Sequence, residues 1–199
     1  MQSISAELRN RAWRKDDYLV STDSKLIPLP TLHAAFASST LYWAKELPDN
    51  VMRETLDNSL CFGLYRLAAN SSGEHVERQS ADQPPISSST TTDSDLVGFA
   101  RCVTDYTTFL YLTDVWVNPS SQGNGLGKWL IACVQEVIKD MPHLRRSMLF
   151  TGDWERSVPF YEKIMDMSVL ETKRGKGLAI MEMKGKGHCN YDGSGSAYQ

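Results

Sequence analysis

The chain has no apolar run that approaches the ~20 residues of a membrane-spanning helix, and its N-terminus lacks the apolar segment of a signal peptide. It has four cysteines, at positions 61, 102, 133 and 189, without the paired spacing of a disulfide framework or a zinc site. These absences argue against a secreted or membrane-inserted protein. They predict a cytoplasmic or nuclear protein whose cysteines are reduced.

An excess of one charge is missing as well. The 21 Lys and Arg residues against 24 Asp and Glu residues give a net charge of −3, so the composition offers no basic surface for nucleic acid. The four histidines (33, 75, 143 and 188) are scattered and do not have the spacing of metal ligands. We therefore expect no nucleic-acid partner, no membrane partner and no metal.

The informative segment is residues 114–128, where a short strand-like run leads into a glycine-spaced loop. Gly123, Gly125 and Gly127 stand at every second position, which lets backbone N–H groups approach a ligand without Cβ atoms in the way. An apolar stripe at three- and four-residue steps then predicts a helix to Met141, and unpaired N–H groups at a helix N-terminus attract anions. The segment predicts a diphosphate site. A plain glycine turn between strand and helix is the alternative.

Two common phosphate-binding motifs do not fit this loop. A Walker A loop needs an earlier glycine and a hydroxyl after the lysine, but Gln122 and Trp129 stand in those positions. A dinucleotide-binding loop needs G-x-G-x-x-G, but Lys128 or Leu130 stands where the last glycine is required. The loop is therefore typical of neither class.

Residues 122–127 do fit Gln-x-x-Gly-x-Gly, which resembles the pyrophosphate loop of the GNAT superfamily of acyl-CoA-dependent N-acyltransferases. A second block, residues 158–167, is similar to the family's Phe-Tyr-Glu-Lys segment, with Tyr161 as its tyrosine. Two residues nearby depart from the family's pattern. Asp166 replaces a usual glycine, and Trp154 stands where many relatives have a cofactor-contacting asparagine.

Three further segments (residues 41–48, 58–65 and 98–105) resemble a subgroup of small, mostly uncharacterised GNAT proteins. The resemblance implies an α/β (mixed α+β) fold, with a mostly antiparallel sheet, one splayed parallel pair of strands and flanking helices. We expect a single domain over residues 1–184, a disordered insertion at about 71–95 and a flexible tail over 185–199. Strands are expected at 18–22, 59–65, 96–104, 109–117, 147–151, 168–171 and 177–183, and helices at 31–43, 51–58, 126–141 and 158–167.

The same resemblance implies acetyl-CoA as cosubstrate, bound by two stretches of backbone. An edge of one strand should pair with the pantetheine, through Val115, Trp116 and Val117. The loop should hold the pyrophosphate, through Gln122, Gly123, Asn124, Gly125, Leu126, Gly127 and Lys128. An acceptor site is expected near Tyr42, Trp43 and Asp105, although core packing of the two aromatic residues and a turn role for the aspartate are the structural alternatives.

The expected reaction transfers an acetyl group to a primary amine of a small molecule by direct attack in a ternary complex. Tyr161 matches the family's general acid, since a neutral phenol can protonate the departing thiolate; its alternative role is to anchor the last helix. Asp114 or Asp105 could accept the amine proton directly or through water; Asp114 is the candidate base, with a structural carboxylate as its alternative. A protein or peptide acetyltransferase and a non-catalytic acyl-CoA-binding module remain alternatives, and either a monomer or a homodimer is compatible with the sequence.

Overall fold

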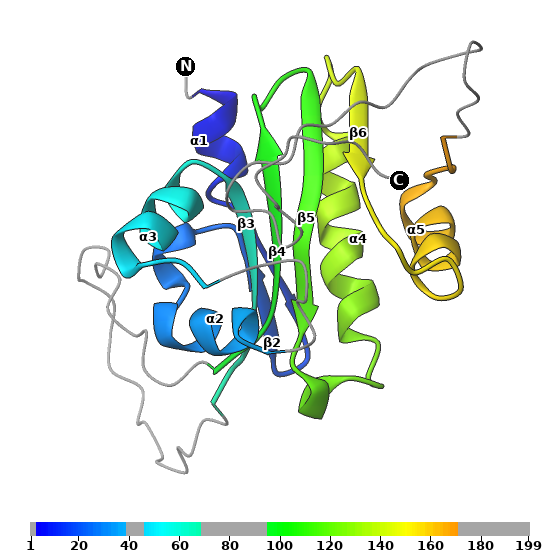
Figure 1. Cartoon of the computed structure of the whole chain (residues 1–199). Coiled ribbons are helices and arrows are strands. Elements are labelled where there is room, and N and C mark those ends of the chain that lie inside the picture. Colours follow the sequence, from blue (N-terminus) through cyan, green and yellow to red (C-terminus); the bar gives the residue numbers. More distant parts are fainter. Residues whose placement is uncertain (1–2, 39–45, 69–94, 171–199) are drawn as a thin grey trace, which may run out of the picture.

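The computed structural model describes residues 3–38, 46–68 and 95–170 (Figure 1). Its centre is a six-stranded sheet in the order β1-β2-β3-β4-β5-β6. Neighbouring strands are antiparallel except for the parallel pair β5–β6. The strands are β1 (Ala12–Lys15), β2 (Tyr18–Ser21), β3 (Leu60–Arg66), β4 (Asp95–Thr104), β5 (Phe109–Val117) and β6 (Arg146–Leu149).

Helices cover both faces of this sheet (Figure 1). They are α1 (Ile4–Leu8), α2 (Leu29–Phe36), α3 (Asp49–Asp57), α4 (Leu126–Lys139) and α5 (Ser157–Met165), with short 3₁₀ turns η1 (Ser24–Leu26) and η3 (Pro119–Ser121). One apolar cluster fills the space between the sheet and α4, and a second fills the space between the sheet, α2 and α3. The predicted mixed fold with a parallel pair of strands is confirmed.

Strand β5 contributes to both clusters because its side chains alternate between the two faces. A register shift between its pairings with Phe99 and Arg101 on β4 changes the phase of this alternation, so even-numbered residues before the shift and odd-numbered residues after it point to the same face. Leu110 and Leu112 belong to the cluster on the α4 face, and Val115 and Val117 pack against that cluster. Trp116 belongs to the cluster under α2 and α3. The two valines therefore lie on the opposite face from Trp116, and β5 connects the core on one face to the core on the other.

The helix and strand predictions fail mainly at element ends. Helix α2 begins at Leu29, two residues before the predicted start, because Pro30 suits a first helical turn. It ends at Phe36, where the Ser38 hydroxyl donates a hydrogen bond to the Ala35 carbonyl oxygen (2.6 Å), so the predicted helix does not continue through residues 37–38. The rest of that prediction, residues 39–43, lies outside the described residues. Residues 168–170 form no strand, and the rest of that predicted hairpin, the insertion at 71–95 and the tail at 185–199 lie outside the described residues.

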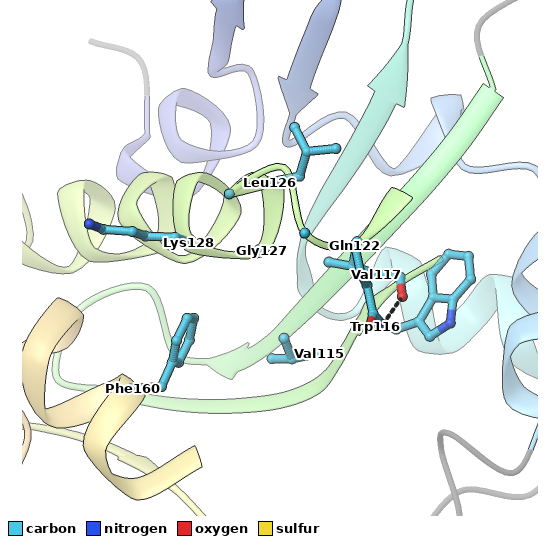
Figure 2. A pocket seen from close by; sticks show the side chains of 10 residues that line it. Val115, Trp116, Val117, Gln122, Leu126, Gly127, Lys128 and Phe160 are labelled. Atoms are coloured by element: carbon cyan, nitrogen blue, oxygen red, sulfur yellow. Dashed lines mark hydrogen bonds between the residues drawn. The ribbon is translucent and has the colours of Figure 1, made fainter. Parts of the chain in front are cut away.

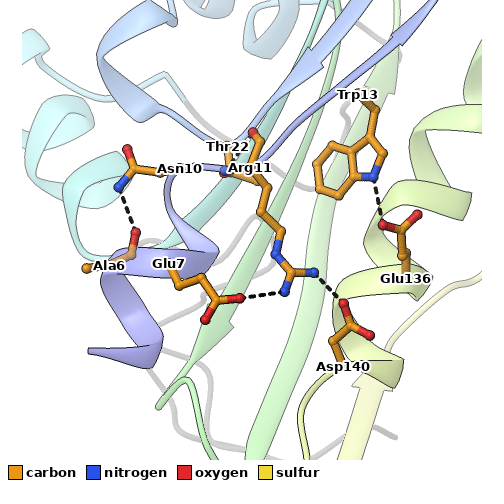
Figure 3. A network of polar contacts seen from close by, with 8 residues as sticks. All are labelled: Ala6, Glu7, Asn10, Arg11, Trp13, Thr22, Glu136 and Asp140. Atoms are coloured by element: carbon orange, nitrogen blue, oxygen red, sulfur yellow. Dashed lines mark hydrogen bonds and ion pairs between the residues drawn. The ribbon is translucent and has the colours of Figure 1, made fainter. Parts of the chain in front are cut away.

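Helix α1 and strand β1 were not predicted, and contacts with distant residues hold this part of the chain in place. The Trp13 ring stacks on Phe62 at 6.0 Å, and its indole N–H donates to a carboxylate oxygen of Glu136 on α4 (3.0 Å). Figure 3 shows Arg11 pairing with both Glu7 (3.0 Å) and Asp140 (2.6 Å). Because the contacts of Arg11 with Asp140 and of Trp13 with Glu136 join residues more than a hundred positions apart, local patterns do not reveal them.

In the described ranges, none of the helices combines the length and apolarity that crossing a lipid bilayer requires. The same residues hold no cluster of three or more His, Cys, Asp or Glu side chains arranged to bind a metal ion.

Candidate functional site

Strands β5 and β6 stop pairing about halfway along β5. Their parallel register runs from Phe109 opposite Arg146 to Leu112 opposite Leu149, and β6 ends there, while β5 continues to Val117. On its other side, β5 still pairs with β4, with Trp116 opposite Phe99 and Val117 opposite Gly98. Beyond Leu112 and Leu149 a gap opens between β5 and β6, and the last part of β5 lies along this gap as an unpaired strand edge. The backbone N–H and C=O groups of this edge can pair with an extended ligand.

The glycine loop follows immediately after this edge. Gly123 (φ 87°) and Gly125 (φ 72°) both have left-handed backbone conformations, and a Cβ atom added to either would meet no atom within 4 Å. Gly125 is the N-cap of α4, and its carbonyl oxygen accepts the N–H of Trp129 (3.0 Å) as the first helical hydrogen bond. The amides of residues 126–128 precede that bond and have no acceptor within the helix. The loop is thus open on one side and rich in N–H donors.

The edge and the loop together line a pocket of about 400 Å³ (Figure 2). Phe160 of α5 is part of its lining, and Lys128 adds a positive charge. None of the lining residues is acidic, so the pocket suits an anion. They are Val115, Trp116, Val117, Gln122, Gly123, Gly125, Leu126, Gly127, Lys128 and Phe160. Nine of the ten predicted cofactor-binding residues are among these ten, while Asn124 is exposed on the loop and outside the lining.

Gln122 braces the loop against the strand. Its side-chain amide donates to the carbonyl oxygen of Val117 (3.0 Å), drawn as the dashed line in Figure 2, and its backbone N–H donates to the carbonyl oxygen of Pro119 (3.3 Å). The backbone N–H and one of the two side-chain N–H groups are therefore already engaged. The contacts favour a structural contribution of Gln122 to the loop over direct donation to a ligand.

The loop geometry makes opposite predictions for two of its glycines. Gly125→Ala is expected to lower the free energy of unfolding by about 1–2 kcal/mol, because an L side chain is strained in the left-handed region. Gly127→Ala is the matched control: an added Cβ would lie 3.6 Å from a Val117 methyl group, which is an ordinary contact, so this variant should be no less stable than the wild type. Urea unfolding without ligand measures both. Equal losses of stability in the two variants would contradict the proposed origin of the strain.

Asp114 lies at a bulge in β5, opposite a register shift in β4 between Phe99 and Arg101. It has a positive φ (52°), and its side chain is buried. One carboxylate oxygen accepts the Nε–H of Arg101 at 2.6 Å, and the other accepts the Thr113 hydroxyl at 3.2 Å. Arg101 also donates to the Ser59 hydroxyl (3.1 Å). These contacts form a clamp of Ser59, which directly precedes β3, Arg101 on β4 and Asp114 on β5, and the clamp holds the bulge next to the pocket.

Tyr161 lies on α5 beside the residue that lines the pocket. Its ring meets the Phe160 ring edge-on, with centroids 5.1 Å apart, and it packs against the apolar cluster on the α4 face. Burial, and to a smaller extent the Cys102 thiol, together raise the pKa of the Tyr161 phenol to about 12. Cys102 is opposite Leu112, the last β5 residue paired with β6, so this contact lies near the point where the two strands part. The phenol is thus kept neutral close to the gap.

Asp105 lies far from this site. It belongs to the turn between β4 and β5, and along the strand it is roughly 20 Å or more from Val115. Its carboxylate accepts hydrogen bonds from the Thr108 hydroxyl and from the N–H groups of Thr107, Thr108 and Phe109. These bonds, the Thr108 side chain first, hold its pKa below the usual range. The geometry favours the turn role. Tyr42 and Trp43, the other two predicted acceptor residues, lie outside the described residues.

Two site residues have no counterpart in the sequence predictions. Phe160 lines the pocket but was treated only as part of the motif around Tyr161. Arg101 was treated only as part of a resemblance, although its burial beside Asp114 makes it a partner of that carboxylate. An arginine in a strand whose neighbours are all apolar was the available signal, because a buried charge needs a partner.

The comparisons with known proteins agree with this geometry. The family model described as "Acetyltransferase (GNAT) family" matches residues 61–167. A curated Gibberella zeae protein, named as a putative acetyltransferase, is 35% identical over 179 residues, which cover 88% of this chain and 95% of that protein.

Solved structures show the same fold. A Xanthomonas campestris pv. campestris protein, described as a putative acetyltransferase of the GNAT family, aligns with a TM-score of 0.56 and 27% identity, covering 82% of this chain and 93% of that one. A Deinococcus radiodurans protein, also described as a putative acetyltransferase, aligns with a TM-score of 0.52 at 15% identity, covering 82% and 91% of the two chains. By the family match, the curated relative and the shared fold, the chain belongs to the GNAT acetyltransferase family.

Proposed function

We propose that this acetyltransferase moves an acetyl group from acetyl-CoA to a primary amine of a small molecule, by direct attack within a ternary complex. The observation that carries the proposal is the gap between β5 and β6, which begins beyond the Leu112–Leu149 pair and adjoins the glycine-loop pocket. A cosubstrate with an extended arm and a diphosphate would fit this combination. Acetyl-CoA supplies the activated thioester.

The binding half of the proposal rests on backbone groups. The pantetheine amides would pair with the edge formed by Val115, Trp116 and Val117, as an added strand does. The diphosphate would meet the N–H groups at the start of α4, where the helix dipole also favours an anion. Lys128 would add its charge from the pocket wall. The open space beside Gly123 and Gly125 supports this fit.

The catalytic half requires several proton and charge movements. The amine, whose protonated form has a reference pKa of ~10.4, must lose one proton to solvent before its nitrogen attacks the thioester carbon. The nitrogen releases a second proton as the amide forms, and solvent would return a proton to the acid that protonates the thiolate. A backbone N–H at the β5 edge would stabilise the negative charge that develops on the carbonyl oxygen. As the carbon–sulfur bond breaks, Tyr161 would donate its phenolic proton to the departing thiolate. The raised pKa of Tyr161, caused by burial, supports the last assignment because the phenol stays protonated until that step.

The contacts of Asp114 bear on the choice of base. Both of its carboxylate oxygens accept hydrogen bonds, one of them from a guanidinium at 2.6 Å. A carboxylate held in this way is better suited to fix the bulge than to accept the amine proton. We therefore assign Asp114 a positioning role, and its replacement by asparagine, considered with Arg101 in the Discussion, tests this assignment.

Direct attack is favoured over a cysteine-bound intermediate. Cys61, Cys102 and Cys133 are all buried, and burial raises the pKa of the thiols of Cys61 and Cys133 to about 12. Burial raises the pKa of Cys102 as well. Since the thiolate is the nucleophilic form, these three thiols are poorly suited to attack a thioester.

The proposal is tested by calorimetric titration with acetyl-CoA, followed by a turnover screen with a panel of small primary amines. We expect saturable binding with one site per chain and the release of coenzyme A that depends on the amine. Binding without release would indicate a non-catalytic acyl-CoA-binding module. Release only with lysine-containing peptides would favour a protein acetyltransferase. Absence of binding at millimolar acetyl-CoA would remove the transferase proposal altogether.

A further inference from the structure

An aromatic patch lies on the sheet face opposite α4, at the end of the sheet formed by β4, β5 and β6. We define it by Val103, Phe109, Tyr111 and Phe150. Phe150 is 61% exposed, Val103 is 43% exposed and Phe109 is 38% exposed. Single exposed apolar side chains are common on protein surfaces. A large contiguous group of them is uncommon and often marks a binding surface.

The strand register shows that these side chains share one face. Leu110 and Leu112 point to the α4 face, so alternation along β5 puts Phe109, Tyr111 and Thr113 on the other. Val103 is directly opposite Tyr111 across the β4–β5 pair. The Phe150 and Tyr111 rings are tilted against each other, with centroids 5.4 Å apart. The four side chains therefore form one continuous surface.

The patch begins where the two parallel strands part. Phe150 is the first residue after Leu149, which ends the β5–β6 pairing, and Tyr111 precedes Leu112, its partner in the last pair. A group held on these two rings would lie immediately beside the gap. In the proposed function, that gap holds the reacting thioester.

Charge near the patch favours a neutral occupant. The Arg101 and Asp114 side chains on this side of the sheet are paired with each other at 2.6 Å, so their charges offset one another. Two further charges lie at the far end of the patch: Asp105, whose carboxylate accepts the Phe109 N–H (3.0 Å), and Arg146, which is opposite Phe109. Phe109 is three residues along β5 from the last strand pair and thus roughly 10 Å from the gap. A short acceptor with its nitrogen at the gap would meet aromatic rings before it reached either charge.

We propose that the aromatic patch selects the acceptor, and that the preferred acceptor is an amine that carries an aromatic ring on a short alkyl linker. Phe150 and Tyr111 would hold the ring, and the amine nitrogen would extend into the gap between β5 and β6. This inference rests on the proposed function, because it names the acceptor class of the same site. It goes beyond that function by assigning specificity to residues outside the glycine loop and outside α5.

The test compares 2-phenylethylamine with ethylamine, which differ by the ring alone. In the wild type, kcat/KM should favour 2-phenylethylamine by about tenfold or more, since burying the ring removes apolar surface from water. Phe150→Ala should abolish most of this preference, chiefly through KM, and Phe150→Leu should retain part of it. Ile4→Ala is the matched control, because Ile4 is an exposed apolar residue (44%) on α1, outside the site.

A binding measurement accompanies the kinetics. The affinity for 2-phenylethylamine, titrated in the presence of coenzyme A, should fall in Phe150→Ala, whereas the affinity for coenzyme A itself should be unchanged. Since Phe150 is mostly exposed, the substitution should not unfold the protein, and thermal melting checks this.

Three outcomes would overturn the inference, and they are distinguishable. If both amines are acetylated equally well, or if Phe150→Ala keeps the wild-type preference, the patch does not select the acceptor and the amine acetyltransferase proposal still stands. If acetyl-CoA binds but no amine is acetylated, the proposed function fails and the inference fails with it. If the affinity for coenzyme A falls together with that for the amine, Phe150 acts on the cofactor side of the site.

Discussion

Arg101→Ala is expected to lower the free energy of unfolding by about 3 kcal/mol or more, since removing one partner of a buried ion pair leaves the other charge uncompensated. Asp114 would keep its buried carboxylate but lose the guanidinium at 2.6 Å, and the Ser59 hydroxyl would lose its arginine donor. Chemical denaturation measures the change. Arg14→Ala, which removes an exposed arginine on β1, is the control and should change stability by less than about 0.5 kcal/mol.

The same clamp should affect catalysis through the bulge. Asp114→Asn keeps a residue that tolerates a positive φ, so it removes the charge without straining the backbone. If Asp114 positions the bulge, this variant loses stability and some activity, but the pH dependence of kcat keeps its shape. A disappearance of the acidic limb of that profile would instead assign Asp114 as the general base. If Arg101→Ala and Arg14→Ala both change the free energy of unfolding by the same small amount, the clamp contributes little to stability.

Tyr161→Phe is expected to reduce kcat by about 10²- to 10⁴-fold, which is the usual contribution of a general acid. The dissociation constant for acetyl-CoA should remain within about twofold of the wild-type value, because the ring still packs against Phe160 and the phenol acts only as the carbon–sulfur bond breaks. Tyr18→Phe, at a half-buried tyrosine on β2, is the matched control and should leave kcat unchanged. An unchanged kcat in Tyr161→Phe would remove this residue from the acid role and leave it as an anchor of α5.

The pH dependence follows from the direction of the Tyr161 shift. Burial raises the pKa of the phenol to about 12, so the acid stays protonated as the pH rises through the ordinary tyrosine range near ~10. The rate should therefore rise with pH as the amine loses its proton, and Tyr161 should cause no alkaline decline below about pH 12. A decline near pH 10 that is absent in Tyr161→Phe would show that the phenol titrates normally and is solvated.

The sequence predicts an element best where neighbouring residues alone determine its backbone conformation. The bounds of β5, Phe109–Val117, are those predicted, because its aromatic, aliphatic and β-branched residues suit a strand and a polar turn follows them. Helix α4 follows the predicted apolar stripe and ends two residues early, at Lys139. The glycine loop was predicted because unusual backbone conformations require glycine at particular positions, and Gly123 and Gly125 adopt them.

Contacts between distant segments decided the rest. Local alternation cannot reveal the bulge at Asp114, which depends on how β5 registers with β4. The partner of Asp114 is Arg101, thirteen residues away across that strand pair, and Phe150 reaches Tyr111 only because β6 lies parallel to β5 after the α4 crossover.

Backbone conformation and amphipathic periodicity are properties of neighbouring residues, so the sequence by itself determined the loop, the strand before it and the helix after it. The pairing of buried charges and the aromatic surface beside the gap are properties of register and crossover, so only the tertiary structure decided them.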